Sequence, residues 1–297
     1  MSLKEKVKIW LGQTRANFLI LSVVLVMIAG AAALDSKQGD ILNFILILIG
    51  VILAHISVNL FNEYSDYKTG IDYLTERTPF SGGSGTLQAK LLTPQSVLIA
   101  AIGTLIAAFL IGLYLAYVST WYILGFMFLG GIAIVFYTTH LAKWTLGELF
   151  AGLCLGTFVV LGGYVVLTKN LTLPIIIISI PPGILTFLLL LLNEFPDVEA
   201  DKQGGRNHLV IKYGKQKASL IYTTGLILTY LIIIGAILTK TVPITLGISL
   251  LTIPIAFKAA SIALKHYDDR AKLIPALGMN VLVVILTDLL LAIGYIL

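Results

Sequence analysis

Two short segments of the sequence place acidic side chains at a spacing that suits metal binding. The first contains Asn62, Asp66 and Asp72, and the second contains Asp197 and Asp201. Residues four apart on a helix share a face, so Asn62 can lie beside Asp66, and Asp197 beside Asp201. Carboxylate and amide oxygens, completed by substrate phosphate oxygens and water, are the ligands that Mg²⁺ prefers. Each segment is therefore a candidate magnesium site.

The two segments repeat one pattern. Its first copy is Asn62, Glu63, Tyr64 and Asp66, and its second copy is Asn193, Glu194, Phe195 and Asp197. This match suggests a duplication within a single domain spanning 1–297, with pseudo-repeats at about 15–138 and 146–264 and a final helix at 275–297. Paired acidic clusters with Arg and Lys nearby suit a diphosphate, which metal ions bridge and cations neutralise.

The composition indicates that these segments belong to a membrane protein. Hydrophobic residues make up 58% of the 297 residues and charged residues only 12%, against about 25% charged in soluble domains. A membrane-spanning helix needs about 20 mostly apolar residues. We therefore expect an all-α, polytopic protein whose helices surround a central polar cavity, with nine spans at roughly 17–34, 41–60, 96–118, 121–138, 146–168, 173–195, 217–238, 243–264 and 275–297.

The distribution of basic residues predicts the orientation of these spans. Of the 20 Lys and Arg residues, only Lys37, Lys169 and Lys240 fall in the loops on one side. Basic residues gather on the cytoplasmic side of membrane proteins. We therefore expect a cytoplasmic N-terminus and a site that opens to the cytoplasm from the cytoplasmic membrane. The net charge of +5 then reflects topology and contact with membrane lipids, and no nucleic-acid partner is expected.

The nine apolar spans and the two acidic segments together resemble those of the UbiA family of intramembrane aromatic prenyltransferases. That family has nine transmembrane helices and two aspartate-rich motifs, after the second and sixth helices. The spacing of Asn62, Asp66 and Asp72 is similar to the first motif of the menaquinone-type branch, and Asp197 and Asp201 are similar to the second motif.

The resemblance implies roles for further residues. Asp66, Asp72, Asp197 and Asp201, helped by Asn62 and Asn193, would hold two Mg²⁺ ions on an isoprenyl diphosphate. Tyr137 and Lys143 lie in a stretch similar to the family's connection between the fourth and fifth helices, whose lysine contacts diphosphate. Residues expected to bind the diphosphate are Arg15, Asn62, Tyr137, Lys143, Asn193 and Arg206. The ring of Tyr64 or Tyr137 would stabilise the carbocation formed from the allylic group.

The branch spacing suggests that 1,4-dihydroxy-2-naphthoate is the aromatic acceptor, in menaquinone biosynthesis. Other acceptors stay open: 4-hydroxybenzoate, homogentisate, a tetrapyrrole or a glyceryl ether lipid. A different class, a secondary transporter or ion-binding carrier, also has intramembrane acids and repeats. The concentration of ionisable residues at one face favours an enzyme. Oligomeric state is not predicted.

Two further features of the sequence each allow two roles. The glycine-rich run from Ser81 to Gly85 could act as a lid over the site, which is the favoured interpretation, or could offer backbone N–H groups to phosphate. Asp288 lies in the middle of the last span, where it is expected either to make a helix-packing hydrogen bond or to line a polar cavity.

Overall fold

The computed structural model describes residues 2–78 and 80–297, and within these residues it contains helices and no strand. Nine helical segments of this part of the chain are long and apolar enough to cross a membrane. These segments are Ala16–Asp35, Ile41–Thr69, Pro94–Val118, Ile123–Leu141, Gly147–Thr168, Leu173–Asn193, Lys215–Leu238, Ile244–His266 and Arg270–Ile296. The predicted fold class and the predicted number of spans are confirmed.

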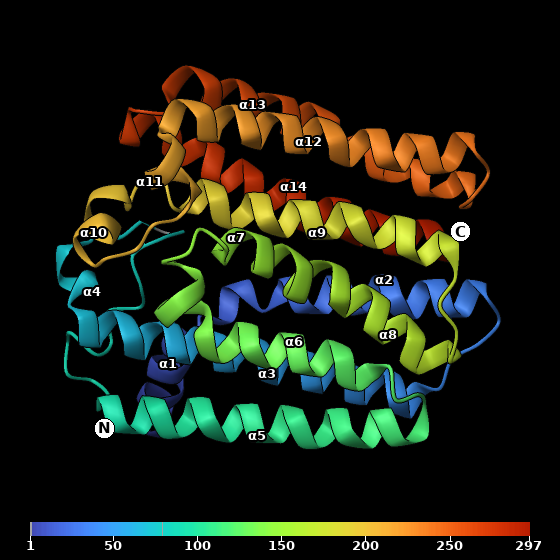
Figure 1. Cartoon of the computed structure of the whole chain (residues 1–297), viewed down its shortest axis with the longest axis horizontal. Helices are drawn as coiled ribbons and strands as arrows, with labels where there is room; N and C mark the ends of the chain where they lie inside the picture. The colour runs from blue at the N-terminus through green and yellow to red at the C-terminus, as the bar shows by residue number, and fades with distance from the viewer. Residues whose placement is uncertain (1, 79) are drawn as a thin grey trace.

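The spanning helices run roughly parallel to one another, and short helices gather at one end of the bundle (Figure 1). Uninterrupted α-helices form five of the spans: α3 (Ile41–Thr69), α5 (Pro94–Val118), α9 (Leu173–Asn193), α12 (Lys215–Leu238) and α14 (Arg270–Ile296). The other four combine η1 (Ala16–Phe18) with α2 (Ile20–Asp35), α6 (Ile123–Phe136) with η2 (Tyr137–Leu141), α7 (Gly147–Phe150) with η3 (Ala151–Thr157) and α8 (Phe158–Thr168), and η4 (Ile244–Thr252) with α13 (Ile253–His266). The short helices are α1 (Leu3–Gln13), α4 (Ile71–Leu74), α10 (Val198–Gln203) and α11 (Leu209–Tyr213).

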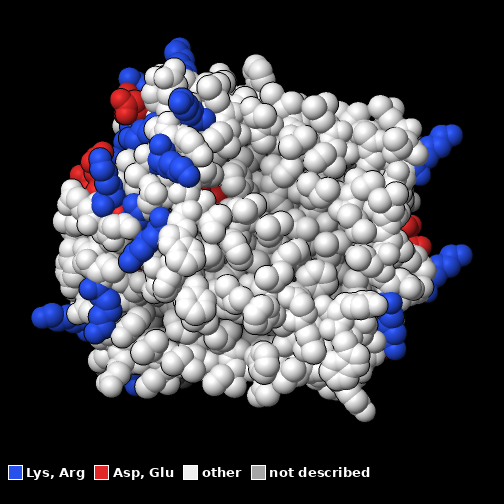
Figure 2. Space-filling model, viewed as in Figure 1, with Lys and Arg blue, Asp and Glu red and all other residues white. Residues whose placement is uncertain are grey.

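At the surface, charged residues gather towards the two ends of the bundle and leave a largely uncharged band between them (Figure 2). On the face shown in Figure 2, Lys and Arg gather mainly at the end that carries α10 and α11 in Figure 1, and fewer lie at the opposite end. An uncharged band of this kind matches the hydrocarbon layer of a bilayer. The chain is therefore built as an integral membrane protein.

The second span extends further than the sequence suggested. Its apolar part was expected to end near residue 60, but α3 continues to Thr69 and ends at Gly70, whose φ of 79° forms a left-handed cap. Polar residues are tolerated in this last part because it lies at the charged end of the bundle. As a result, Asn62 and Asp66 are held on a rigid helix, while Asp72 follows on α4 after the turn at Gly70.

A close approach between η3 and α9 forms one wall of the interior. A Cβ atom at Gly156 would lie 2.6 Å from the Cα of Gly183, and one at Gly152 would lie 2.6 Å from the carbonyl oxygen of Gly183. Only glycine allows two backbones to come this near. Gly152 and Gly156, four residues apart in the sequence, form this contact.

Candidate active site

A cavity of about 340 Å³ opens among the ends of the spans that carry the two acidic segments. Its polar part is lined by Asp66, Asp72, Asp197 and Asp201 together with Asn62 and Asn193. Its apolar part continues between helices α3, α6, η3 and α9, where it is lined by Val51, Ala54, Val58, Ala133, Ile134, Leu155, Leu189 and Leu190. The cavity therefore joins a cluster of carboxylates to an apolar channel.

The turn at Gly70 returns Asp72 to the same cavity as Asp66, as the sequence suggested. Both carboxylates are buried, with 5% of Asp66 and 6% of Asp72 exposed. Gln88 donates a hydrogen bond of 2.6 Å from Nε2 to Asp72 Oδ2. Burial, reinforced by the neighbouring Asp66, raises the pKa of Asp72 to about 7.

Arg206 joins the two acidic segments. Its guanidinium group pairs with Asp66 on α3 and donates from Nη1 to Asp201 Oδ1 at 2.8 Å. Burial of Arg206 would lower its pKa, but the two carboxylates raise the pKa above its ordinary value. A permanent positive charge therefore holds the carboxylates of both segments on one side of the cavity.

The two carboxyl groups of the second segment differ in their electrostatic environment. Burial raises the pKa of Asp197 to about 7, and the neighbouring Asp201 adds to this effect. Burial would also raise the pKa of Asp201, but its neighbours His208 and Arg206 lower the pKa below its ordinary value. Asp201 is therefore ready to act as an anion, whereas Asp197 loses its proton fully only when a cation or higher pH favours the charged form.

The glycine-rich loop packs against both acidic segments. Ser81 donates from its hydroxyl to Asp197 Oδ1 at 3.3 Å. Gly83, with a φ of 70°, passes so close to Asp72 that a Cβ atom would lie 2.8 Å from Oδ1. Gly82 and Gly83 line the cavity. The loop thus lies against the site, and its role, as a lid or as a source of backbone N–H groups for phosphate, stays a prediction.

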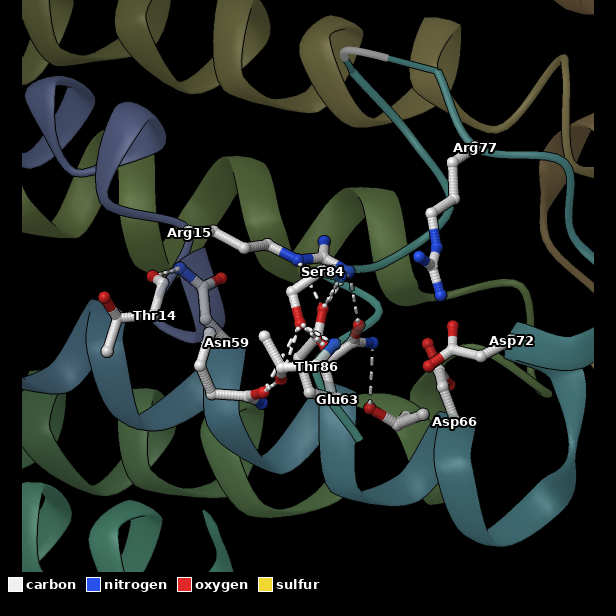
Figure 3. A network of polar contacts seen from close by, with 12 residues as sticks. Thr14, Arg15, Asn59, Glu63, Asp66, Asp72, Arg77, Ser84 and Thr86 are labelled. Carbon is white, nitrogen blue, oxygen red and sulfur yellow. Dashed lines mark hydrogen bonds and ion pairs between the residues drawn. The ribbon is translucent and has the colours of Figure 1, made fainter. Parts of the chain in front are cut away.

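A hydrogen-bond network ties the same loop to α3, the second span, and through it to Arg15 (Figure 3). Ser84 donates to Glu63 from its backbone N–H at 2.9 Å and from its hydroxyl at 2.6 Å. Glu63 also accepts from Arg15 Nε at 2.9 Å. Arg15 lies within 3.5 Å of the side-chain oxygen of Asn62 and lines the cavity. Glu63, which sequence analysis noted only as part of the repeat, therefore orients both Arg15 and the loop.

Most of the residues predicted for the site reach the cavity. Its lining includes Arg15, Asn62, Asp66, Asp72, Tyr137, Asn193, Asp197, Asp201 and Arg206. Asn193 leaves its buried side-chain oxygen without a hydrogen-bond partner among the described residues. This oxygen is a further candidate ligand for a metal ion.

Two of the suggested residues lie elsewhere. Lys143 is exposed at the surface and is absent from the cavity lining, because it follows the π-helical turn η2 at the end of the fourth span. Its contact with a diphosphate stays a prediction. Tyr64 packs with Leu60 and Val97 on the side of α3 that faces α5. Of the two tyrosines, Tyr137 is therefore the one that lines the cavity.

Asp288 also lies away from the cavity. It is fully buried in α14, and neither carboxyl oxygen has a hydrogen-bond partner among the described residues. The neighbouring Asn280 makes the helix-packing bonds instead: it accepts from the Tyr222 hydroxyl at 3.0 Å and donates to the carbonyl of Leu188 at 3.2 Å. Asp288 thus makes no helix-packing hydrogen bond among the described residues and does not line this cavity.

Comparison with known proteins assigns this arrangement to a family. Residues 23–283 match the UbiA prenyltransferase family. A 1,4-dihydroxy-2-naphthoate octaprenyltransferase of Bacillus subtilis (strain 168) is 30% identical over 81% of this chain and 77% of its own length. The protein of the same name from Escherichia coli (strain K12) is 26% identical over 98% of this chain and 96% of its own length.

Solved structures share the fold. The apo structure of a UbiA homologue from Aeropyrum pernix K1 superposes with a TM-score of 0.71 at 16% identity, covering 94% of this chain and 97% of its own. A UbiA homologue from Archaeoglobus fulgidus, bound to DMAPP and Mg²⁺, gives a TM-score of 0.64 at 13% identity, covering 96% of this chain and 99% of its own. The carboxylate-lined cavity, the nine spans and these matches lead to one conclusion: the chain belongs to the UbiA prenyltransferase family and is an integral membrane prenyltransferase.

Proposed function

We propose that this enzyme transfers an isoprenyl group from an allylic isoprenyl diphosphate to 1,4-dihydroxy-2-naphthoate, with two Mg²⁺ ions at the aspartate segments. The observation that carries the proposal is the convergence of Asp66, Asp72, Asp197 and Asp201 at one end of a cavity whose other end is an apolar channel. The polar end suits a diphosphate and the channel suits a hydrocarbon tail.

The residues present fit magnesium. The four aspartates and the side-chain amides of Asn62 and Asn193 line the polar end. The oxygen of Asn193 is buried without a hydrogen-bond partner among the described residues. Oxygen ligands of this kind, with few other donors, are those that Mg²⁺ takes. Magnesium bound here would neutralise the negative charge that develops on the leaving diphosphate. The solved Archaeoglobus fulgidus homologue contains Mg²⁺ together with DMAPP.

Side chains of the cavity then account for the transfer. Arg15 and Arg206 would hold the diphosphate as the allylic C–O bond breaks and its electron pair leaves with the diphosphate oxygen. Tyr137 lines the cavity, where its ring would stabilise the carbocation left behind. A ring carbon of the aromatic acceptor would attack this carbon and form the new C–C bond. With 1,4-dihydroxy-2-naphthoate, the acceptor carboxylate would then leave as CO₂, and its bonding electrons would restore the aromatic ring. The loop that carries Ser81 and Gly83 would keep water away from the cation.

The acceptor assignment rests on two observations. The spacing of Asn62, Asp66 and Asp72 is that of the menaquinone-type branch, and relatives named 1,4-dihydroxy-2-naphthoate octaprenyltransferase match most of the chain. The charge distribution further supports a site that opens to the cytoplasm. Family membership sets aside the transporter alternative.

A panel of acceptors tests this proposal. Purified protein in lipid would receive geranylgeranyl diphosphate, Mg²⁺ and either 1,4-dihydroxy-2-naphthoate, 4-hydroxybenzoate or homogentisate, with products identified by mass spectrometry. We expect a prenylated naphthoquinol that has lost the acceptor carboxylate. Product from another acceptor alone, at equal enzyme concentration, would contradict the acceptor assignment and leave prenyl transfer intact.

A further inference from the structure

A second group of potential metal ligands lies beside the cavity, outside the aspartate segments. Glu148 on α7, Glu194 after α9 and His208 before α11 each offer one ligand atom, and these atoms lie within 4.8 Å of one another. Glu148 is fully buried and only 2% of His208 is exposed. Of the three, only Glu194 lines the cavity, so the group stands behind the cavity wall.

The ligand atoms of this group contact one another and Asp201 but form no hydrogen bond of good geometry among the described residues. Among the described residues, Glu148 Oε2, Glu194 Oε2 and both ring nitrogens of His208 are buried without a hydrogen bond. Leaving a buried polar atom unsatisfied is costly, and native proteins rarely do so without a ligand, ion or water at the place. One ligand atom from each of Glu148, Glu194 and His208 lies within 4.8 Å of the other two, which indicates that this place binds a ligand.

The three side chains are also fixed in position. Glu148 accepts a hydrogen bond from the backbone N–H of Leu209 to Oε1 at 2.6 Å, which leaves Oε2 free to face the group. The backbone N–H of Asn207 donates to the carbonyl of Ala142 at 2.9 Å, and Thr145 donates from its hydroxyl to the carbonyl of Asn207 at 2.8 Å. The chain before His208 is thus tied to the chain before Glu148.

The orientation of His208 is that of a metal-bound imidazole. Its Nδ1 lies 3.4 Å from Glu194 Oε2, and its Nε2 lies 3.3 Å from Asp201 Oδ2 on the other side of the ring. Metal-bound histidines commonly direct their second nitrogen to a carboxylate, which fixes the ring and strengthens the ligand. Asp201 would fill that place here.

We propose that Glu148, Glu194 and His208 bind a divalent transition-metal cation, Zn²⁺ or Mn²⁺, at a site separate from the magnesium at the aspartate segments. An imidazole with two carboxylates suits these cations, whereas Mg²⁺ favours oxygen ligands alone. The ion would cross-link α7, the end of α9 and the start of α11. Through His208 it would also hold Asp201, so it would act as a structural brace for the second aspartate segment.

Metal content tests the proposal independently of prenyl transfer. Untagged protein in lipid nanodiscs would be stripped with a chelator, equilibrated separately with Zn²⁺, Mn²⁺ or Mg²⁺, and measured by elemental analysis. Addition of Co²⁺ would report an imidazole-containing site by its visible absorption. The variants are His208→Gln and Glu148→Gln, with His140→Gln as the matched control because His140 is exposed at the surface. Asp66→Asn separates this site from the aspartate segments.

We expect one tightly bound Zn²⁺ or Mn²⁺ ion per chain in the wild type, in His140→Gln and in Asp66→Asn, and no comparable retention of Mg²⁺. Both His208→Gln and Glu148→Gln should weaken binding at least about tenfold. The ion should also raise the Tm of the wild type and leave that of folded Glu148→Gln unchanged. A wild type that binds neither ion, or binding that survives in both ligand variants, would overturn the proposal.

Discussion

The contact between the glycine-rich loop and Asp72 gives the sharpest single-residue prediction. At Gly83 a Cβ atom would lie 2.8 Å from Asp72 Oδ1, whereas ordinary contact begins at 3.4 Å. Gly83→Ala therefore pushes the carboxylate and the loop apart by about 0.6 Å. Because a displacement of about 1 Å at a reacting group can cost about 100-fold in rate, we expect kcat/KM to fall by about 10- to 100-fold, equal to about 1.4–2.7 kcal/mol.

The control variant is Gly70→Ala. Gly70 has a similar positive φ, 79° against 70° at Gly83, but no atom lies within 4 Å of the position that its Cβ would take. Alanine at either position carries a left-handed backbone cost of about 1–2 kcal/mol, which thermal unfolding would register in both. Only Gly83→Ala should lose prenyl transfer and require more Mg²⁺. Equal loss of kcat/KM in Gly70→Ala would refute the reasoning, since the backbone alone would then explain the effect.

Three further outcomes follow from the site. Glu63→Gln should lower the Tm and raise the KM for the isoprenyl diphosphate several-fold, because Arg15 loses its 2.9 Å ion-pair partner; unchanged melting and kinetics would contradict this. Apparent Mg²⁺ affinity, measured by calorimetry, should rise with pH up to about 7 and then level off, since burial raises the pKa of Asp72 and of Asp197 to about 7 and a metal ion must displace those protons. An affinity that is constant from pH 5 to 8 would count against it. Val51→Phe should favour shorter isoprenyl diphosphates in competition assays, because Val51 lines the channel about 16 Å of helix beyond Asn62; an unaltered product distribution would show that the tail lies elsewhere.

Local spacing and composition were enough to predict the architecture and most of the cavity. Apolar length alone located the nine spans, because a bilayer imposes one length on every helix that crosses it. The spacing of Asn62, Asp66 and Asp72 predicted one shared site, and both carboxylates line the same cavity. Such features depend on residues that are near each other in the chain.

Features that depend on folding between distant segments were not visible in the sequence. Glu148 and His208 are separated in the chain by η3, α8, α9 and α10, and no spacing rule relates them. Gln88 reaches Asp72 only because the loop folds back. Lys143 lies in a stretch that resembles the family's connection between the fourth and fifth helices. The sequence pattern did not indicate the π-helical turn η2 that comes just before Lys143. The pseudo-repeat likewise stays a prediction.

The central claim is that carboxylates of both acidic segments act together in magnesium-dependent prenyl transfer. Its most direct test is product formation by purified wild type, Asp66→Asn and Asp197→Asn in lipid, with and without Mg²⁺. Glu199→Gln serves as the matched control, because Glu199 lies between Asp197 and Asp201 but is exposed and outside the cavity lining. We predict prenylated product only with Mg²⁺, retained in Glu199→Gln and lost in both aspartate variants. Product that forms without divalent metal, or that survives in a folded Asp66→Asn or Asp197→Asn variant, would contradict the claim.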